Sequence, residues 1–463
     1  MGVEQITSAE LSKKIWSLSN VLRDDGIVFH KYMSELTYLL FLKVADQTRR
    51  NDSLPKGCRW SDLVAHPMNG LVGVYRKMLT QLGEDSATKV VRDIFGFPTT
   101  VFTHDENLHK VVHEIDKLNW KEISGEAFGF IYESLLERNA TEARAGAGQY
   151  FTPRPLVDCI VRTVAPMRGE IIQDPSVGTG GFLTSANEFI ARKSARETQG
   201  TRFEGVEIER DTYRLCLMNL FLHDIDGKIV HGDALTDDVA QLSRPDLILA
   251  NPPFGSSAGG VRPKRSDLPF QTSNKQLMFL QHIYRSLAPG GRAAVIVPDN
   301  VLFEPGMGKR IRQDLMQSCN LLVVLRLPQG IFYAQGVNTN VLFFKSGEPT
   351  SEVAFYDMRT NVRRFSKRNL LSRETFKEFE EVCADPFAKK RKKFKLASST
   401  DRLKIVSRKT IAARDENLDI SWLPRSRSAA PEVEDIDQLL SRISENLQAA
   451  LRRVEDVERE ILG

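Results

Sequence analysis

Residues 1–145 carry apolar positions with the three- and four-residue spacing of amphipathic helices. These stripes cover residues 11–22, 36–44, 111–118 and 128–135. The polar segments 46–50 and 53–57 interrupt the pattern and indicate a loop. The N-terminal part is therefore expected to be a helical bundle, in which core packing explains every apolar residue of the stripes.

Residues 146–350 alternate short apolar runs with helical patterns, the order typical of an α/β domain with a parallel sheet. Strands are predicted at residues 171–174, 203–207, 228–230, 245–250, 292–298, 321–327 and 339–344. A helix is predicted over 276–287, before Gly290 and Gly291 break the pattern. The polar stretch 256–274 predicts a mobile lid or flap over a neighbouring site, or equally a disordered surface insertion.

A glycine-rich turn follows the first predicted strand and precedes a helical pattern. The turn contains Gly178, Thr179, Gly180 and Gly181, and Asp174 ends the strand before it. The glycines let the backbone approach a ligand without a Cβ in the way, at the end of the sheet where nucleotide-like ligands bind. The GxGxxG spacing of dinucleotide folds and the Lys-Ser or Lys-Thr of phosphate-binding loops are absent. The turn is therefore expected to bind an adenosine without a pyrophosphate.

The next two predicted strands each lead to an acidic residue. Glu207 ends the apolar run 203–207, where a carboxylate can accept both hydroxyls of a ribose. Asp233 follows the run 228–230, where it can meet an adenine amino group. Each acid alone is more often a solvated strand-end residue than a ligand contact. One such residue after each successive strand, however, indicates a single binding site.

The fourth predicted strand is followed by Asn251, Pro252, Pro253 and Phe254. An exocyclic amine of adenine is a poor nucleophile, because its lone pair is delocalised into the ring. The side-chain carbonyl of Asn251 and the backbone carbonyl of Pro252 can each accept one amine hydrogen, which frees the lone pair for attack. The prolines make the turn rigid, and Phe254 offers a flat face to the base. For the tetrapeptide alone, a plain polar turn is the alternative.

The order of a cofactor segment, a glycine loop and the Asn-Pro-Pro-Phe loop resembles that of the gamma-type adenine-N6 DNA methyltransferases, which use S-adenosylmethionine. Segments 149–157, 174–183, 218–223 and 251–255 resemble the modification subunit of type I restriction–modification systems. The resemblance spans roughly residues 120–350, and no separate sequence-reading domain is visible. It implies methyl transfer from S-adenosylmethionine to the N6 amine of an adenine that has left the DNA duplex.

The resemblance also implies roles for individual residues. Those implied to bind S-adenosylmethionine are Gln149, Tyr150, Phe151, Thr152, Pro153, Arg154, Asp174, Gly178, Thr179, Gly180, Gly181, Glu207 and Asp233. Those implied to hold and stack the target base are Asn251, Pro252, Pro253 and Phe254, with Tyr150 as a second stacking face. The sulfonium is already an excellent leaving group, so catalysis is mainly positioning and polarisation. No metal is expected for this step.

These patterns predict an α/β, Rossmann-like S-adenosylmethionine-dependent methyltransferase domain at 146–425, after an N-terminal helical domain at 1–145. In residues 426–463, apolar residues from Ile436 to Ile461 alternate steps of three and four, which is the seam of a coiled coil. A single helix packed on its own domain is the alternative, although its apolar face is usually wider. The resemblance implies that this helix docks on the DNA-specificity subunit.

Positive charge is concentrated in the last part of the methyltransferase domain, residues 359–409, where 17 Lys or Arg stand against 6 Asp or Glu. The densest run is 389–395. Such a run can neutralise phosphates of double-stranded DNA, and its contribution should fall with salt. A merely solvated charge run is the alternative. The resemblance also allows for a second copy of the chain and a restriction endonuclease subunit in the same complex.

Composition agrees with this interpretation without deciding it. The chain has 463 residues, a hydrophobic share of 41% and a net charge of +4, enough for two or three domains with a sizeable core. Its five cysteines form no CxxC pair and have no spacing suited to zinc, so reduced core residues are expected. The polar N-terminus lacks an apolar signal region. We expect a cytoplasmic location in a bacterium or archaeon, and no membrane partner.

Two other functions share parts of this pattern. A methyltransferase that acts on RNA or on a protein glutamine meets the same amine chemistry, but the type I-like segments and the coiled-coil end argue against it. A catalytically inactive assembly scaffold would keep the fold without the chemistry, and the intact Asn251, Asp174 and Glu207 argue against that.

Overall fold

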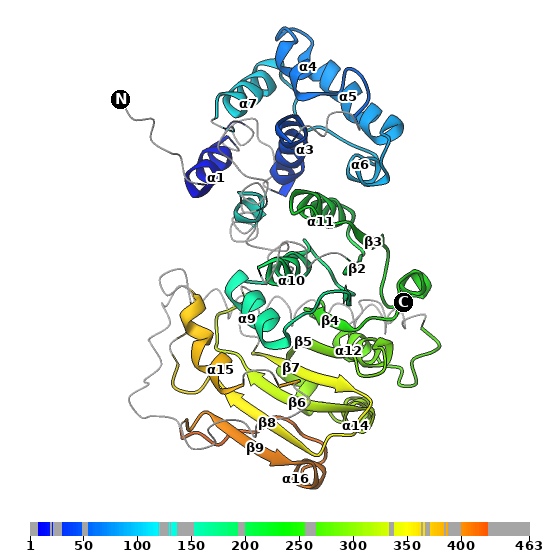
Figure 1. Cartoon of the computed structure of the whole chain (residues 1–463), viewed down its shortest axis with the longest axis vertical. Helices are drawn as coiled ribbons and strands as arrows, with labels where there is room; N and C mark the ends of the chain where they lie inside the picture. The colour runs from blue at the N-terminus through cyan, green and yellow to red at the C-terminus, as the bar shows by residue number, and fades with distance from the viewer. Residues whose placement is uncertain are drawn as a thin grey trace, which may run out of the picture. The chain divides into compact units, whose positions relative to one another are not determined.

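The structure is a computed structural model of the 463-residue chain (Figure 1). It describes residues 8–18, 21, 30–48, 54–118, 120, 129, 131–136, 152–192, 200–254, 265–332, 338–362, 364–365, 371–383, 386–387 and 400–424. The chain forms two compact units, one of Met1–Arg359 with Arg364–Ile420 and one of Thr360–Arg363 with Ser421–Gly463. In the second unit, the side-chain amide of Asn361 donates to the carbonyl of Pro424 at 3.1 Å. The predicted coiled-coil helix in 426–463 and the basic run 389–395 lie outside the described residues.

The N-terminal part of the first unit is helical, as predicted. Its helices are α1 Ser8–Ser17, α3 His30–Gln47, α4 Trp60–Ala65, α5 Leu71–Asp85, α6 Lys89–Ile94 and α7 Asp105–Lys117, and residues 129 and 131–136 are also helical. Helices α4, α5 and α6 were not predicted, although α5 buries Leu71, Tyr75 and Leu79 on one face. The predicted loop 46–50 begins too early, because α3 continues through Gln47.

The helical part packs on α11 (Arg210–Leu222) through aromatic and polar contacts. The ring of Phe41 in α3 lies 4.9 Å from that of Phe221. The hydroxyl of Tyr213 donates to Asp93 at 3.0 Å, and the Arg214 guanidinium donates to the carbonyl of Phe97 at 3.1 Å. Helix α11 is therefore shared between the core of the helical part and the core of the sheet.

A mixed sheet forms the centre of the first unit, and its described strands lie in the order β3-β2-β1-β4-β5-β7-β6-β8-β9. The strands are β1 Ile171–Asp174, β2 Arg202–Glu207, β3 Gly227–His231, β4 Leu247–Ala250, β5 Arg292–Pro298, β6 Cys319–Arg326, β7 Thr339–Ser346, β8 Glu352–Asp357 and β9 Leu403–Ser407. Strands β1 to β5 are parallel, β7 runs antiparallel to β5 and β6, and β9 runs antiparallel to β8. The predicted α/β sheet is confirmed.

Strand β1 lies between β2 and β4, so the chain order reverses at this point of the sheet. The connections from β1 to β2 and from β4 to β5 therefore leave the sheet in opposite directions. The position outside the carboxyl ends of these strands, called the crevice below, is where folds of this kind bind ligands. Every residue of β4 and of β5 is buried. Such continuous apolar runs are typical of parallel strands covered on both faces.

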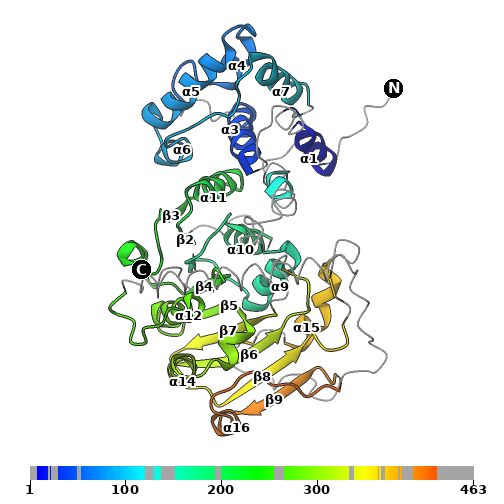
Figure 2. The same ribbon diagram turned by 180° about the vertical axis from the view of Figure 1, so that it is seen from behind.

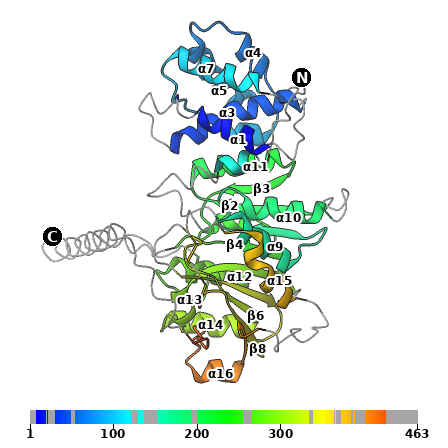
Figure 3. The ribbon, with the colours of Figure 1, turned by 90° about the vertical axis from the view of Figure 1, so that its left-hand side faces the viewer.

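Helices cover both faces of the sheet, as Figure 2 and Figure 3 show from two further directions. One layer holds α9 Arg154–Val164, α10 Gly181–Ala191, α11 and α15 Lys377–Val382, and the other holds α12 Lys275–Ser286, α13 Asp299–Phe303 and α14 Met307–Ser318. The remaining short elements are the 3₁₀ turns Asp237–Gln241 and Arg373–Phe376 and the helix α16 Arg408–Ala413. Helix α9 is fixed to α15 by a bidentate ion pair between Arg162 and Glu380.

Two parts of the prediction need correction. Strands β8 and β9 were not predicted. Strand β8 lies just beyond the predicted α/β segment 146–350. Strand β9 lies within the segment that was interpreted only as basic surface, and it is an edge strand in which Lys404 and Ile405 are exposed. The interpretation of residues 256–274 as a disordered insertion is wrong for 265–274. There Leu268 is 2% exposed and Gln281 of α12 holds the backbone of Phe270.

Membrane-spanning helices are absent from the part of the chain that the structure describes. No helix there combines the length and the apolar character needed to cross a bilayer. All five cysteines are free and buried, as predicted.

The buried Arg292 of β5 ties the sheet to the end of α9, and its loss should destabilise the fold. Its guanidinium donates to both oxygens of Glu170, at 2.6 and 3.1 Å, and to the carbonyls of Val164 and Ala165. Arg292→Met leaves the buried carboxylate of Glu170 without its ion-pair partner, with the Met167 N–H still donating to it, and such a loss costs about 3–5 kcal/mol. Urea unfolding measures this loss, and adding Glu170→Gln should recover most of it. An Arg292→Met protein whose free energy of unfolding lies within about 1 kcal/mol of that of the parent protein would contradict the role of this pair.

Candidate active site

The carboxyl ends of β1, β2 and β4 bring three predicted site residues to one edge of the sheet. Asp174 ends β1 and Glu207 ends β2, and both strands are parallel neighbours. Asn251 follows β4, which pairs with β1 on its other side. The sequence placed these residues on separate strands, and the observed strand order makes them neighbours at the crevice.

The glycine loop between β1 and α10 has the left-handed backbone that its residues predict. Gly178 has a φ of 55° and Gly180 a φ of 85°, values that L side chains rarely adopt. The loop is bound to β2, because Val177 N–H donates to the carbonyl of Val206 at 3.0 Å and Gly178 N–H donates to the carboxylate of Glu207 at 3.0 Å. The loop is therefore held in place before any ligand arrives.

The carboxylates of Asp174 and Glu207 lie in a buried environment. Asp174 is 2% exposed and Glu207 is 6% exposed. Burial raises the pKa of Asp174 to about 7, and the nearby Glu207 carboxylate raises it as well, while the N–H and hydroxyl of Ser176 lower it. Burial also raises the pKa of Glu207, against the N–H groups of Glu209 and Gly178, which lower it. Two such acids favour a ligand that offers hydroxyl and N–H donors.

Asp233 lies at the next strand end, after β3, and is partly buried. Its carboxylate accepts from the backbone N–H of Leu235 at 2.8 Å, and its own N–H donates to Asp238 at 3.0 Å. These contacts fix the turn in which the acid sits. Its role as a contact of an adenine amino group stays a prediction.

Asn251 is held in one orientation by the segment that precedes α9. Its amide Nδ2 donates to the hydroxyl of Thr152 at 3.0 Å. The other end of the amide, Oδ1, is buried and has no hydrogen-bond partner among the described residues. An unpaired buried acceptor costs about 1–3 kcal/mol, and such groups are rare in folded proteins. The arrangement therefore aims a free carbonyl acceptor at whatever enters the site.

The residues after Asn251 are braced from two sides. Gln276, at the start of α12, is 3% exposed and donates from its amide to the backbone carbonyl of Pro253 at 3.2 Å. The ring of Phe254 makes an edge-on contact with Phe332, with ring centres 6.0 Å apart. The tetrapeptide is thus a fixed turn with a half-buried aromatic face, and Pro252 within it is buried.

The predicted cofactor segment is only partly described. Gln149, Tyr150 and Phe151 lie outside the described residues. Pro153 is the N-cap residue before α9, and its carbonyl accepts from the N–H groups of Leu156 and Val157. Arg154 directs its guanidinium at three carboxylates, those of Glu133, Asp158 and Glu188, and its role as a cofactor ligand stays a prediction.

Two residues that hold the site were not predicted. One is Gln276, which braces Pro253; the other is Asn219 of α11, which is 1% exposed and donates to the carbonyl of Thr179 at 2.8 Å. Asn219 is a polar residue inside the otherwise apolar stretch 218–222, and this break in the pattern could have indicated its role. Gln276 stands at the start of an amphipathic helix, where nothing in the pattern distinguishes it.

A separate hollow lies at the outer side of α11 and β3. It measures about 340 Å³ and is lined in part by Lys89, Phe97, Arg210, Lys228 and His231. None of the described residues predicted for the site lines it. This basic hollow therefore lies apart from the strand-end residues.

The chain is similar to known DNA-modifying proteins over most of its length. Residues 123–429 match the sequence model of the N-6 DNA methylase family. The methylase subunit of the type I restriction enzyme EcoKI from Escherichia coli strain K12 is 39% identical, in an alignment that covers 98% of this chain and 95% of that protein.

Solved structures give the same result for the fold. The crystal structure of the EcoKI M protein is 37% identical and covers 96% of each chain, with a TM-score of 0.54. A chain from a structural study of complex assembly and conformational transition in a type I R-M system is 26% identical and covers 98% of each chain, with a TM-score of 0.75. The likeness extends from the helical part through the sheet.

The buried carboxyl of Asp174 should make stability depend on pH. Its pKa is about 7 in the folded protein, well above the ordinary value of 3.8. Between roughly pH 4 and 7 the folded chain binds this proton and the unfolded chain does not, so stability falls as pH rises through that window. Asp174→Asn removes this dependence. Its free energy of unfolding relative to the parent should increase by up to about 1.4 kcal/mol per pH unit there.

Denaturant unfolding of the ligand-free proteins at pH 5, 6, 7 and 8 measures this difference. Asp226→Asn, at an exposed position after α11, is the matched control and should follow the parent curve. Parallel curves for the Asp174→Asn and parent proteins would show that the Asp174 carboxyl is already ionised at pH 5.

Proposed function

We propose a mechanism from one premise: this chain belongs to the N-6 DNA methylase family, among the methylase subunits of type I restriction enzymes. Its activity is the transfer of a methyl group from S-adenosylmethionine to the N6 amine of adenine in DNA. The observation that carries the mechanism is the buried, unpaired Oδ1 of Asn251, whose amide is fixed by Thr152. It is an acceptor that lacks a donor, and the target amine is a donor that needs an acceptor.

The crevice beside β1 and β2 fits the adenosyl part of the cofactor. The left-handed Gly178 and Gly180 bring the backbone close to the ligand, and the buried carboxylate of Glu207 would accept the ribose hydroxyls. Asp174, at the end of β1, would line the same pocket. When bound, S-adenosylmethionine supplies an electrophilic methyl group on a sulfonium that leaves readily.

The Asn-Pro-Pro-Phe turn would hold the target amine. Asn251 Oδ1 accepts one amine hydrogen and the Pro252 carbonyl accepts the other, so the lone pair turns out of conjugation and toward the methyl group. Thr152 fixes the Asn251 amide, and Gln276 fixes the adjoining Pro253. Because these groups are in place beforehand, little reorganisation is needed at the moment of reaction.

The target adenine must leave the duplex to reach this turn, since its amine is paired in DNA. Phe254 would stack on the extruded base, and its edge-on contact with Phe332 keeps the ring from turning away. Tyr150 remains the proposed second stacking face, on sequence grounds alone. No residue at the turn needs to change its protonation state in order to bind the amine.

We further propose the division of labour along the chain. Residues 1–145 form a helical domain, residues 146–425 the methyltransferase domain with a basic end, and residues 426–463 a helix that docks on a DNA-specificity subunit. The partners are then double-stranded DNA and that subunit. A second copy of this chain and a restriction endonuclease subunit are further candidate members of the complex. The alternatives, an RNA or protein-glutamine methyltransferase and an inactive scaffold, lack a specific observation that favours them.

The role of Asn251 predicts a loss of transfer with cofactor binding retained. Asn251→Ala should lower the methyl-transfer rate by at least about 10²–10³-fold, because an anchor of the amine is lost. Thr152→Val should lower it less, by roughly tenfold, since Oδ1 remains but the amide can turn. Methyl transfer to DNA and calorimetric affinity for S-adenosylmethionine are measured on the same preparations.

Thr80→Val, at an exposed hydroxyl of α5, is the matched control for the change of Thr152 and should leave both quantities unchanged. An Asn251→Ala protein that keeps substantial activity would remove the proposed role of Asn251. If Asn251→Ala lowers the affinity for S-adenosylmethionine as much as it lowers the methyl-transfer rate, Asn251 binds the cofactor instead.

If the C-terminal helix docks on a specificity subunit, its removal should abolish site-specific methylation without unfolding the methyltransferase domain. A chain that ends at Pro431 should stay folded and bind S-adenosylmethionine, but lose co-purification with a specificity subunit and lose site-specific methylation. Leu447→Glu, in the middle of the seam, should act in the same way, because burying an unpaired charge is costly. Arg452→Ala, off the seam, is the control. If the truncated chain alone methylates a defined DNA sequence as well as the full complex does, the subunit assignment fails.

A further inference from the structure

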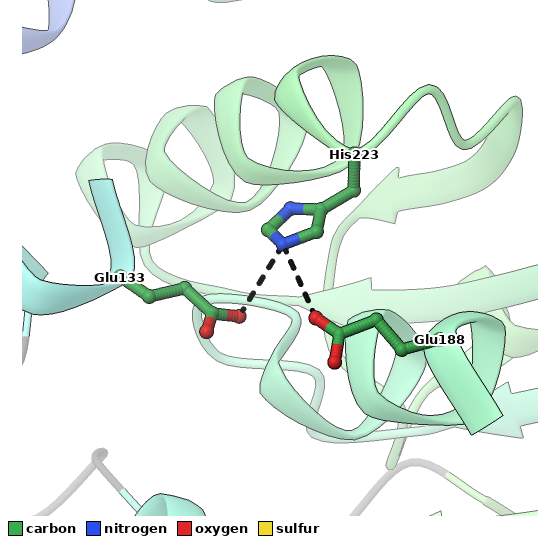
Figure 4. Close-up of side chains that lie close together, drawn as sticks. All are labelled: Glu133, Glu188 and His223. Atoms are coloured by element: carbon green, nitrogen blue, oxygen red, sulfur yellow. Dashed lines mark ion pairs between the residues drawn. The ribbon is translucent and has the colours of Figure 1, made fainter. Parts of the chain in front are cut away.

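Three potential metal ligands meet between the helical part and the sheet, away from the strand-end site (Figure 4). Glu133 comes from the helical segment 131–136, Glu188 from α10, and His223 directly follows α11. One ligand atom from each lies within 4.8 Å of the others. These residues are far apart in the sequence, so no spacing motif indicates them.

The tautomer of His223 is fixed by the backbone. Its Nδ1 lies 2.8 Å from the carbonyl oxygen of Asn219, which can only accept, so Nδ1 carries the hydrogen. In the neutral ring the lone pair is then on Nε2. The His223 side chain is only 6% exposed, and Nε2 faces Oε1 of Glu133 at 3.8 Å and Oε1 of Glu188 at 3.7 Å. A lone pair and two carboxylate oxygens repel one another unless a cation lies between them.

The two carboxylates are held in this orientation by their other contacts. Arg154 donates to Oε2 of Glu133 and, at 2.7 Å, to Oε2 of Glu188. The hydroxyl of Thr184 donates to Oε1 of Glu133 at 3.0 Å. Supporting hydrogen bonds of this kind orient the ligands of metal sites, and a histidine that donates its second nitrogen's hydrogen to a carbonyl is the commonest example.

The charges of this half-buried network do not balance. The carboxylates of Glu133, Asp158 and Glu188 carry three negative charges, and Arg154 contributes one positive charge. Arg192 also approaches Glu188, at 3.4 Å, but its side chain is 70% exposed and its contribution is screened by solvent. The network therefore retains excess negative charge at the point where Nε2 of His223 faces the two oxygens.

We propose that Glu133, Glu188 and His223 bind a divalent transition-metal ion, with Zn²⁺ as the best fit. Around one Zn²⁺, with metal–ligand bonds of about 2.0–2.2 Å, tetrahedral ligand atoms lie ~3.4 Å apart. The observed distances of 3.7 and 3.8 Å need only a small contraction to reach this. An imidazole with two carboxylates favours Zn²⁺ and its neighbours over Mg²⁺ and Ca²⁺, which prefer oxygen ligands alone.

The site would join the helical part to the methyltransferase domain. Gly129 shows how closely the two approach, because a Cβ there would lie 2.5 Å from Nε2 of His223. Arg154, which holds both glutamates, stands two residues after Thr152, and Thr152 holds Asn251. The metal has a structural role in this proposal: it fixes the segment that orients Asn251, and methyl transfer does not use it.

The test is metal binding by the purified full-length chain after treatment with a chelator and dialysis. Zn²⁺ is titrated against a chromophoric competitor, and Co²⁺ is titrated with the visible absorption of the bound ion as the readout. We expect one site per chain and a melting temperature raised by about 2 °C or more with Zn²⁺. His223→Gln and Glu188→Gln should weaken Zn²⁺ binding by at least about 100-fold, since each removes a direct ligand.

Two variants serve as controls. His231→Gln removes an exposed imidazole at the end of β3, and Arg192→Gln removes the exposed partner of Glu188; both should bind one Zn²⁺ as the parent does. The competing explanation is that a proton on His223 supplies the missing charge. In that case the parent chain binds Zn²⁺ no more tightly than the His223→Gln variant does, and its melting temperature does not change when Zn²⁺ is added. Either of these two results for the parent chain overturns the proposal. If a variant does not fold, the Zn²⁺ titration of the parent chain alone decides between the two explanations.

Discussion

The orientation of the Asn251 side chain is the constraint on which the site depends. A carboxamide can turn either end toward a ligand, and in the structure its Nδ2 end donates to the Thr152 hydroxyl, which leaves the carbonyl oxygen unpaired among the described residues. The price of this arrangement is a buried acceptor without a partner. A protein selected for stability alone would satisfy that oxygen, so its persistence points to a donor that arrives with the substrate.

Around this side chain, each loop at the strand ends is fixed by a buried polar residue from another element. Glu207 of β2 holds the glycine loop through Gly178, and Asn219 of α11 holds it through Thr179. Gln276 of α12 holds Pro253. These contacts cross from one strand–helix unit to the next, so the shape of the crevice follows from packing of the whole sheet. Such preorganisation suits a reaction whose leaving group needs no activation.

Sequence reasoning predicted what local patterns encode. Strands β4 to β7 were found because their apolar runs are nearly continuous, and β1 to β3 because a short apolar run leads into a turn or an acidic residue. The strand-end residues followed from their positions after those runs. Strand β8 was missed although it is an almost wholly buried apolar run, because it lies just beyond the predicted segment 146–350. Strand β9 was missed because it is a short edge strand in which only Val406 is fully buried, and the short helices α4 and α6 because they carry too few turns for a period. Gln276 and Thr152 were not assigned their bracing contacts, since these join residues far apart in the chain. The cluster of Glu133, Glu188 and His223 has the same character: no spacing predicts it.

The most direct test of the central claim is a structure of the chain with its specificity partner, target DNA and a cofactor analogue that cannot donate a methyl group. We expect an extruded adenine whose N6 lies within hydrogen-bond distance of Asn251 Oδ1 and of the Pro252 carbonyl. The Thr152 contact to Asn251 Nδ2 should be retained. An adenine amine bound elsewhere, or an Asn251 Oδ1 paired with a protein group while the base is in place, would contradict it.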